Sequence, residues 1–248
     1  MKITFLGTGT STGIPQIGCD CETCTSNNPK DKRLRASVLI EEDNIGILID
    51  SGPDMRQQLL QHDIRHISGL LITHEHYDHL GGLDDVRPLG EVNVYAEKKV
   101  ANVIRHNMSY CFTDNKYPGV PAIRLHEIDL QPFIVQKLTI VPVRVMHARL
   151  PILGFRIGKM AYLTDVKTIE ETELNKLNDI DVLILNALRI KPHISHLSLS
   201  EAVELAKKIG AKRTYFTHFS HHLGKHDVAQ AIIPRNMYIA YDDLVVEI

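Results

Sequence analysis

Short apolar segments recur along the chain, each ending in glycine, proline or polar residues, and stretches with helical spacing lie between them. Because strands alternate with a period of two and helices with 3.6, this pattern predicts a mixed α/β protein. The expected strands cover residues 2–6, 36–40, 45–49, 70–73, 92–95, 138–145, 154–157, 160–163, 182–185 and 214–217. The expected helices cover residues 53–62, 83–86, 97–107, 168–178, 198–209 and 228–233, and a terminal strand pair is expected within 238–248.

Two features refine this outline. Ser198 and Glu201 have the spacing of a capping box, and Gly210 marks the end of the helix that they open. Residues 108–133 lack clear periodicity and contain several prolines, so they are expected to form a loop-rich insert, either a lid or a surface excursion. With no linker and no short repeat in view, we expect residues 1–248 to form a single domain of packed layers.

Composition narrows the class of protein. Hydrophobic residues make up 44% and charged residues 23%, as in ordinary globular domains. The formal charge of −2 argues against a broad nucleic-acid-binding surface, so nucleic acid is an unlikely partner. The start lacks the apolar core of a signal peptide, and no later run is long enough to span a membrane. These features predict a cytoplasmic protein with no membrane partner.

The segment from Leu70 to Gly82 carries the densest chemistry. An apolar run ends in three histidines and an aspartate within six residues, His74, His76, Asp78 and His79. In an extended backbone His74 and His76 point to the same side and can reach one metal ion, whereas Asp78 and His79 follow where the chain turns, toward a second ion. The alternative is a polar loop with scattered histidines, but groups crowded this closely are poor core material unless a cation binds them.

Other apolar strands also end in a potential metal ligand. His147, Asp165 and His218 each follow such a strand, as the His74–His79 segment does. Ligands just past strand ends can converge on one edge of a sheet assembly. The repetition therefore predicts a metal centre built from distant parts of the chain.

The cysteines indicate a second metal site. Cys19, Cys21 and Cys24 fall within six residues and Cys111 stands alone, which in a reducing compartment favours metal binding over disulfides. Free thiols are the alternative. The spacing leaves the fourth ligand open, and the candidates are Cys111, His221, His222 and His226.

The remaining polar motifs have plainer interpretations. Gly7–Gly13 lacks a phosphate-loop pattern and is expected to be a tight turn near the site, with phosphate contact as the alternative. The run Lys30–Arg35 is expected to be solvated, with Arg33 or Arg35 holding a phosphate as the alternative. The other histidines are expected at the surface or in loops, and these are His62, His66, His106, His126, His193, His222 and His226.

The ordered set of His74-x-His76-x-Asp78-His79, His147, Asp165 and His218 resembles the metallo-β-lactamase superfamily over nearly the whole chain. The resemblance implies a four-layer αββα sandwich. It implies two divalent ions: one held by His74, His76 and His147, the other by Asp78, His79 and His218, with Asp165 bridging them. It also implies that Asp50 supports a ligand histidine by a hydrogen bond.

A narrower resemblance, to the cyclic-phosphate phosphodiesterase branch, is carried by Cys19-x-Cys21-x-x-Cys24 and by Thr217–His221. It implies that these three cysteines and His221 hold a structural zinc, a closed Cys₃His site. It further implies that His196 is a catalytic proton donor, although a histidine that satisfies a loop carbonyl before a helix is the alternative.

Together these observations predict a metal-dependent hydrolase. The narrower resemblance implies the substrate: two ions, Zn²⁺ or Mn²⁺, would share a hydroxide that attacks a small cyclic phosphodiester of a phosphorylated sugar, of the phosphoribosyl 1,2-cyclic phosphate kind, with Asp78 and His196 as catalytic residues. A homodimer is compatible with the sequence. Two alternatives are an endonuclease resembling the tRNA 3′-processing enzymes, which share the Phe5–Gly9 opening, and a non-catalytic metal-bearing binding module.

Overall fold

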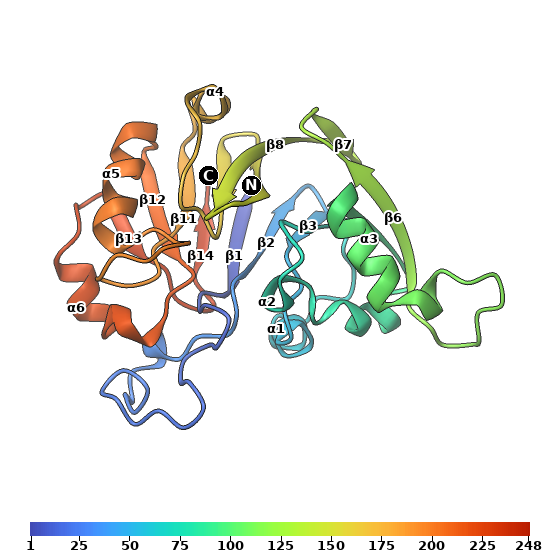
Figure 1. Ribbon diagram of the computed structural model, residues 1–248, viewed down its shortest axis with the longest axis horizontal. Coiled ribbons are helices and arrows are strands. Elements are labelled where there is room, and N and C mark those ends of the chain that lie inside the picture. The colour runs from blue at the N-terminus through green and yellow to red at the C-terminus, as the bar shows by residue number, and fades with distance from the viewer.

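The computed structural model describes residues 1–248 and consists of two seven-stranded β-sheets that face each other, with helices on both outer sides (Figure 1). The first sheet has the order β14 (Val245–Glu247), β1 (Lys2–Gly7), β2 (Ser37–Glu42), β3 (Ile45–Ile49), β4 (Gly69–Leu71), β5 (Glu91–Glu97) and β6 (Ala122–Ile128). The second has the order β13 (Met237–Ile239), β12 (Arg213–Thr217), β11 (Val182–Asn186), β10 (Met160–Leu163), β9 (Leu150–Ile157), β8 (Leu138–His147) and β7 (Phe133–Val135).

Both sheets combine antiparallel and parallel pairing in a similar way. In the first, β1, β2 and β3 pair antiparallel and β3 to β6 pair parallel. In the second, β7 to β10 pair antiparallel and β10 to β13 pair parallel. In each parallel set the carboxyl ends of the strands meet at the same edge, which is where α/β proteins place their sites.

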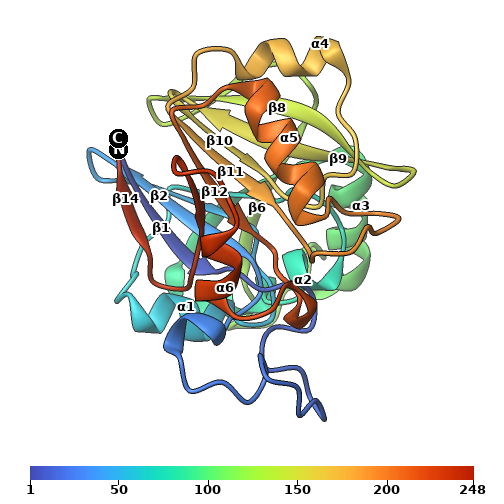
Figure 2. The same ribbon diagram turned by 90° about the vertical axis from the view of Figure 1, so that its left-hand side faces the viewer.

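The helices cover the outer faces of the sheets. They are α1 (Met55–Gln61), α2 (Tyr77–Leu80), α3 (Lys98–Asn107), α4 (Glu171–Leu174), α5 (Leu199–Ile209) and α6 (His226–Ala231). Short 3₁₀ turns are η1 (Pro29–Asp31), η2 (Leu83–Leu89), η3 (Ser109–Cys111), η4 (Asn175–Leu177) and η5 (His221–Leu223). Figure 2 shows α5 and α6 lying outside the second sheet. No helix is both long and apolar enough to cross a membrane.

Three hydrophobic clusters hold these layers together. The central cluster contains residues of both sheets, such as Phe5 and Ile47 from the first and Phe155 from the second. One outer cluster packs α1 and α3 on the first sheet, and the other packs α5 on the second sheet. Burial of apolar area in three stacked interfaces is the main stabilising contribution. The predicted αββα sandwich is confirmed.

Several local predictions are also confirmed. The hairpin of β2 and β3 turns at Asp43 and Asn44, whose φ angles of 47° and 66° are those of a tight hairpin turn. Ser198 and Glu201 form both hydrogen bonds of the capping box at the start of α5, and Gly210 ends the helix with a φ of 74°.

Other predictions were wrong. The segment 108–133 is not wholly a loop, because residues 122–128 form β6 and pair in parallel with β5 along its whole length. The expected terminal strand pair does not form: β13 joins β12 in the second sheet, whereas β14 crosses to β1 in the first. The expected helix over 168–178 shortens to α4 and η4. In each case long-range pairing or packing decides the structure rather than local pattern.

We expect Ser198→Ala to lower the free energy of unfolding by about 1 kcal/mol, because the fully buried N-cap hydroxyl accepts from the backbone N–H of Glu201. Urea denaturation followed by circular dichroism measures this change. Ser200→Ala, at an exposed position of the same turn, is the matched control and should change stability by much less. Equal effects of the two substitutions would contradict the capping role.

Candidate functional site

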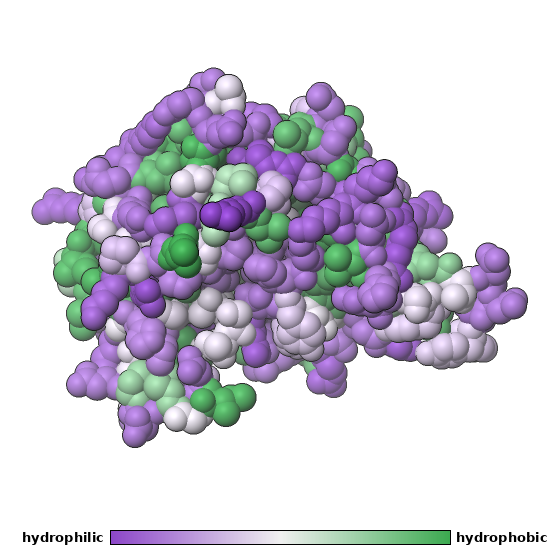
Figure 3. All heavy atoms as spheres, viewed as in Figure 1, coloured by the Kyte–Doolittle hydropathy of each residue, from purple (hydrophilic) through white to green (hydrophobic).

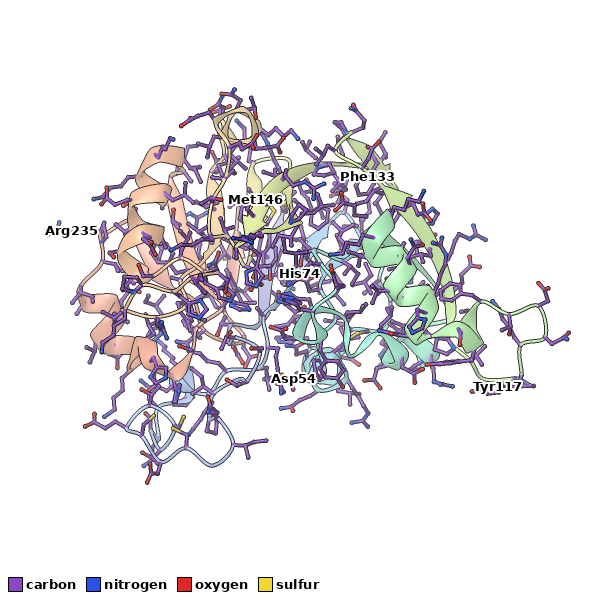
Figure 4. The ribbon with its side chains drawn as sticks, in the orientation of Figure 1. Asp54, His74, Tyr117, Phe133, Met146 and Arg235 are labelled. Carbon is purple, nitrogen blue, oxygen red and sulfur yellow. The ribbon has the colours of Figure 1, made fainter.

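The predicted ligand residues lie at the carboxyl ends of strands from both sheets. The His74–His79 segment follows β4, His147 is the last residue of β8, Asp165 follows β10 and His218 follows β12. Figure 4 places the labelled His74 near the middle of the molecule, between its two halves. The edge formed by the two sheets therefore gathers residues that are up to 144 positions apart in the sequence.

Three residues at these strand ends have a left-handed backbone. The φ angles of Asp50, Asp165 and His218 are 63°, 56° and 60°. A side chain with a Cβ in this region costs roughly 1–2 kcal/mol per residue relative to a right-handed conformation. Such strain persists where surrounding structure imposes it, commonly at functional sites. Here the left-handed conformation of each residue turns the backbone sharply, directly after a strand.

One half of the site is built from imidazoles. Nε2 of His74 lies 3.0 Å from Nδ1 of His76, and the ring of His147 lies 5.2 Å from that of His76, centroid to centroid. Nδ1 of His147 donates a hydrogen bond to the backbone oxygens of Asp165 and Ser195, at 3.1 and 2.9 Å. Because Nδ1 is the donor, Nε2 of His147 is left as the ring's free ligand atom.

The other half combines imidazoles and carboxylates. Nε2 of His79 lies 2.9 Å from Oδ2 of Asp165 and 3.3 Å from Oδ2 of Asp78. Nε2 of His218 lies 3.3 Å from Oδ1 of Asp165 and 3.5 Å from Oδ2 of Asp78. Asp165 thus contacts both histidines through its two oxygens, so the structure brings all seven predicted active-site ligands together.

A hydrogen-bonded support holds His79 in place. Its Nδ1 donates to Oδ2 of Asp50 at 2.7 Å, which leaves Nε2 facing the site. Asp50 also accepts from the backbone N–H of Thr73 at 2.9 Å and from the Thr73 hydroxyl, and it is fully buried. The expected contact of Asp50 with a ligand histidine is therefore present.

The charge states follow from burial and close neighbours. Burial favours the neutral form of Asp165, but His218 and His79 outweigh it and hold the pKa of that carboxyl well below its usual range. Burial alone would lower the pKa of His79, yet Asp50, Asp165 and Asp78 raise it well above its ordinary value. Burial lowers the pKa of His74 well below its ordinary value. Ionised carboxylates beside crowded imidazoles form a strongly cation-attracting set.

Two of the candidate ligand nitrogens have no hydrogen-bond partner in the protein, and this indicates whether a metal ion fits the site. Nε2 of His79 and of His218 are buried and form no hydrogen bond, although carboxylate oxygens lie close by. A buried polar atom without a partner costs roughly 1–3 kcal/mol. These nitrogen and oxygen atoms lie close together without hydrogen-bond geometry. This is the arrangement expected of ligands that surround a cation. Imidazole with carboxylate suits zinc or manganese, so the donor set fits divalent ions.

His196 stands at the edge of this centre. Its Nδ1 lies 3.1 Å from Oδ1 of Asp165, and its ring lies 4.5 Å from that of His147 and 5.1 Å from that of His218. Nδ1 is buried and forms no hydrogen bond, so the alternative of a histidine that satisfies a loop carbonyl is wrong for this atom. Burial lowers the pKa of His196 to about 3.

The cysteine cluster closes around His221. Nδ1 of His221 lies 3.2, 3.4 and 3.5 Å from Sγ of Cys19, Cys21 and Cys24. These four atoms all lie within 4.8 Å of one another, a compact set that can surround one ion. Cys111 is buried elsewhere in the core of the first sheet, so it is no candidate for the fourth position.

Two predictions about charged residues were wrong. The run Lys30–Arg35 is not fully solvated, because Asp31 and Arg33 are buried. Arg33 donates from Nη1 to the Thr8 hydroxyl and to the backbone oxygen of Ala240, and its guanidinium lies over the ring of Phe219. Its role is therefore structural and not phosphate binding. His226, expected at the surface, is also buried, with Nδ1 at 3.4 Å from Nη2 of Arg33.

Sequence reasoning missed three supporting residues. Thr73 contacts both Asp50 and Nδ1 of His74, and its polar side chain directly before His74 was the available signal. Asn186 holds the Asp165 turn through two hydrogen bonds with the backbone of Val166. At Gly52 a Cβ would lie 2.2 Å from the backbone oxygen of Asp78, so only glycine lets the two loops approach. The last two contacts carry no local sequence signal.

Several known proteins are similar to this chain in sequence or in fold. The octanoyltransferase of Porphyromonas gingivalis is 44% identical over 98% of this chain, and the chain spans 51% of that relative's length. A crystal structure described as a new diphosphatase from the PhnP family matches with a TM-score of 0.93 and 39% identity, covering 100% of this chain and 97% of that one. The short form of human tRNase Z shares the fold, with a TM-score of 0.76 and 21% identity over 100% and 99% of the two chains.

The family match covers the part of the chain that carries most of the site. Residues 46–219 match the family described as "Beta-lactamase superfamily domain", and this range contains all seven of the converging histidines and aspartates. The resemblance read from the sequence is thereby confirmed. The chain belongs to the β-lactamase superfamily and has the metallo-β-lactamase fold.

Proposed function

We propose that this chain is a metal-dependent phosphodiesterase that hydrolyses a small cyclic phosphodiester of a phosphorylated sugar. The observation that carries the proposal is the convergence of seven ligand side chains with unpartnered buried nitrogens, beside a further histidine at the edge. The similarity to a structure described as a diphosphatase from the PhnP family supports hydrolysis at a phosphoryl group.

The residues divide into two ligand sets. His74, His76 and His147 would hold one ion, Asp78, His79 and His218 the other, and Asp165 lies where it can contact both. When bound, two divalent ions make water available as a nucleophile near neutral pH and neutralise charge that develops on the phosphoryl oxygens. The protein orients the ligands, through Asp50 on His79 and through the backbone oxygens that accept from His147.

His196 is the proposed proton donor to the leaving oxygen. Its ring lies against the rings of His147 and His218, so a phosphate held at this centre would be within its reach. Its low pKa in the substrate-free protein reflects burial first. The negative charge of a bound phosphodiester would favour the imidazolium form and so prepare the donor.

A diphosphatase is the second candidate, because a structure 39% identical over the whole chain is described as one. The tRNA-processing alternative has less support. The projecting segment of residues 108–121 contains one lysine and no arginine, so it offers no cationic arm for a polynucleotide. Its labelled residue Tyr117 lies at the outer end of the molecule, far from His74 (Figure 4).

One set of assays separates these activities. The protein is incubated with Mn²⁺ or Zn²⁺, or with a chelator, and offered bis(p-nitrophenyl) phosphate, a ribose cyclic phosphate, a nucleoside diphosphate or precursor tRNA. We expect metal-dependent hydrolysis of the first two. Cleavage of the diphosphate alone would favour the second candidate, and inertness toward all four would favour a binding module.

For the cysteine cluster we propose a structural zinc held by Cys19, Cys21, Cys24 and His221. The backbone N–H of Cys24 is the largest of the influences that lower the pKa of the Cys21 thiol to about 6, so this sulfur is readily available as a thiolate. None of the four cysteines forms a disulfide, which leaves these three available as metal ligands.

We expect Asp50→Asn to weaken metal binding at the active site by about 10–100-fold, because His79 loses its carboxylate partner. Competition with a chromogenic chelator measures this affinity. Asp179→Asn, in the exposed turn between η4 and β11, is the control and should bind metal as the parent protein does. An unchanged affinity in Asp50→Asn would contradict the supporting role.

His196→Ala should lower kcat toward a cyclic phosphodiester by about 10²–10⁴-fold, the usual contribution of general acid catalysis. Metal content, measured by plasma emission spectrometry, should stay the same. His106→Ala, at an exposed site on α3, is the control. Loss of a metal ion would instead identify His196 as a ligand, and an unchanged kcat would exclude the proton-donor role.

Cys21→Ser should release one zinc per chain and lower the melting temperature, since a closed structural site contributes directly to folding. Zinc content and thermal unfolding are measured on the same preparation. Cys111→Ala, which removes the isolated thiol, should retain the zinc. Equal zinc content in the two variants would overturn the assignment.

A further inference from the structure

A cavity lies between α2 and the end of α3, beside the segment that carries His76 and Asp78 (Figure 1). Its volume is about 330 Å³, within the range of roughly 300–1,000 Å³ that small-molecule sites occupy. Glu75 and Tyr77 are part of its lining, and in the sequence they alternate with the ligands His74, His76 and Asp78. The proposed hydrolysis makes no use of this cavity.

The floor of the cavity is apolar and rigidly held. It is made by Leu80, Leu83, Ile104 and Met108. Each of these side chains is less than one-tenth exposed and belongs to the outer hydrophobic cluster of the first sheet. Because the floor is already packed, a ligand with an apolar body would bury surface there without much ordering of the protein.

Two tyrosine rings complete the apolar part of the lining. A Cβ at Gly81 would lie 2.7 Å from Cε2 of Tyr77, so this ring packs directly against the glycine, although Tyr77 remains 73% exposed. The hydroxyl of Tyr110 donates to Oδ1 of Asp84 at 2.6 Å, which fixes the second ring. The faces of such rings carry partial negative charge and attract cations.

The charged groups of the lining have one sign. Glu75 and Asp84 contribute carboxylates, and no lysine, arginine or histidine lines the cavity. Arg87 lowers the pKa of the Asp84 carboxyl, which therefore stays ionised near neutral pH. Lys99 and Arg87 pair with the two carboxylates from outside the lining, and both cations are more than one-third exposed. Exposed pairs contribute little, so the lining still favours a cation over a neutral molecule.

We propose that this cavity binds an organic ammonium ion with an apolar body, of about the size of choline. Its alkyl groups would lie on the apolar floor, and its charge would face Glu75 and the rings of Tyr77 and Tyr110. Aromatic faces are a common means of recognising quaternary ammonium groups. An anion would meet two carboxylates here, so the site is distinct from the one that holds the phosphodiester, and the inference does not depend on the proposed function.

The first test compares choline with 3,3-dimethyl-1-butanol, a neutral molecule of the same shape. The zinc-loaded protein is used, so that the active-site carboxylates do not themselves attract the cation. NMR titration should show shifts at the backbone amides of residues 75–84 and 104–110, and choline should bind about tenfold more tightly than the alcohol. Equal affinities would overturn the selectivity for ammonium, and shifts elsewhere or none at all would overturn the site.

The second test changes the lining. Tyr77→Leu removes an aromatic face and keeps apolar area, and Glu75→Gln removes a charge. At equal zinc content each should weaken choline binding about tenfold and leave the affinity for the alcohol nearly unchanged. The matched controls Tyr238→Leu, on β13, and Glu204→Gln, on α5, are at exposed positions outside the lining and should bind choline as the parent protein does. Choline binding that is unchanged in both lining variants would refute the proposal.

Discussion

Three buried or nearly buried carboxylates surround the imidazole of His79, and this concentration of negative charge is the constraint on which the site depends. Asp50 fixes one ring nitrogen, while Asp78 and Asp165 lie close to the other. Unpaired charge in the interior is costly unless cations or hydrogen bonds offset it. The fold satisfies part of this need with hydrogen bonds from Thr73 and leaves the remainder for divalent ions.

The candidate ligands are divided between the two sheets, so the site forms only when the sheets pack together. The first sheet supplies Asp50 and the His74–His79 segment, and the second supplies His147, Asp165 and His218. The apolar layer between the sheets fixes their relative position, so packing far from the site sets the distances within it. The outer surface in Figure 3 is mixed, with hydrophilic residues interspersed with smaller apolar areas, as expected when the apolar residues are used mainly inside.

Much of this could be predicted from the sequence, because the residues concerned carry local signals. Strands ending in His74, His147 or His218 were recognisable from apolar runs that stop at a histidine, and the capping box at Ser198 was explicit. What could not be predicted depends on contacts between distant segments. The pairing of β6 with β5, the separation of β13 from β14 and the burial of Arg33 against Phe219 and Ala240 have no counterpart in local spacing.

His218 and His221 lie on one short segment: His218 directly follows β12, and His221 is the first residue of η5. One faces the hydrolytic centre and the other the thiols of Cys19, Cys21 and Cys24. A change at those thiols would therefore reach the position of His218 through only two intervening residues, Phe219 and Ser220, although no cysteine lies among the converging histidines and aspartates. The shared segment thus makes the geometry of one cluster depend on the state of the other.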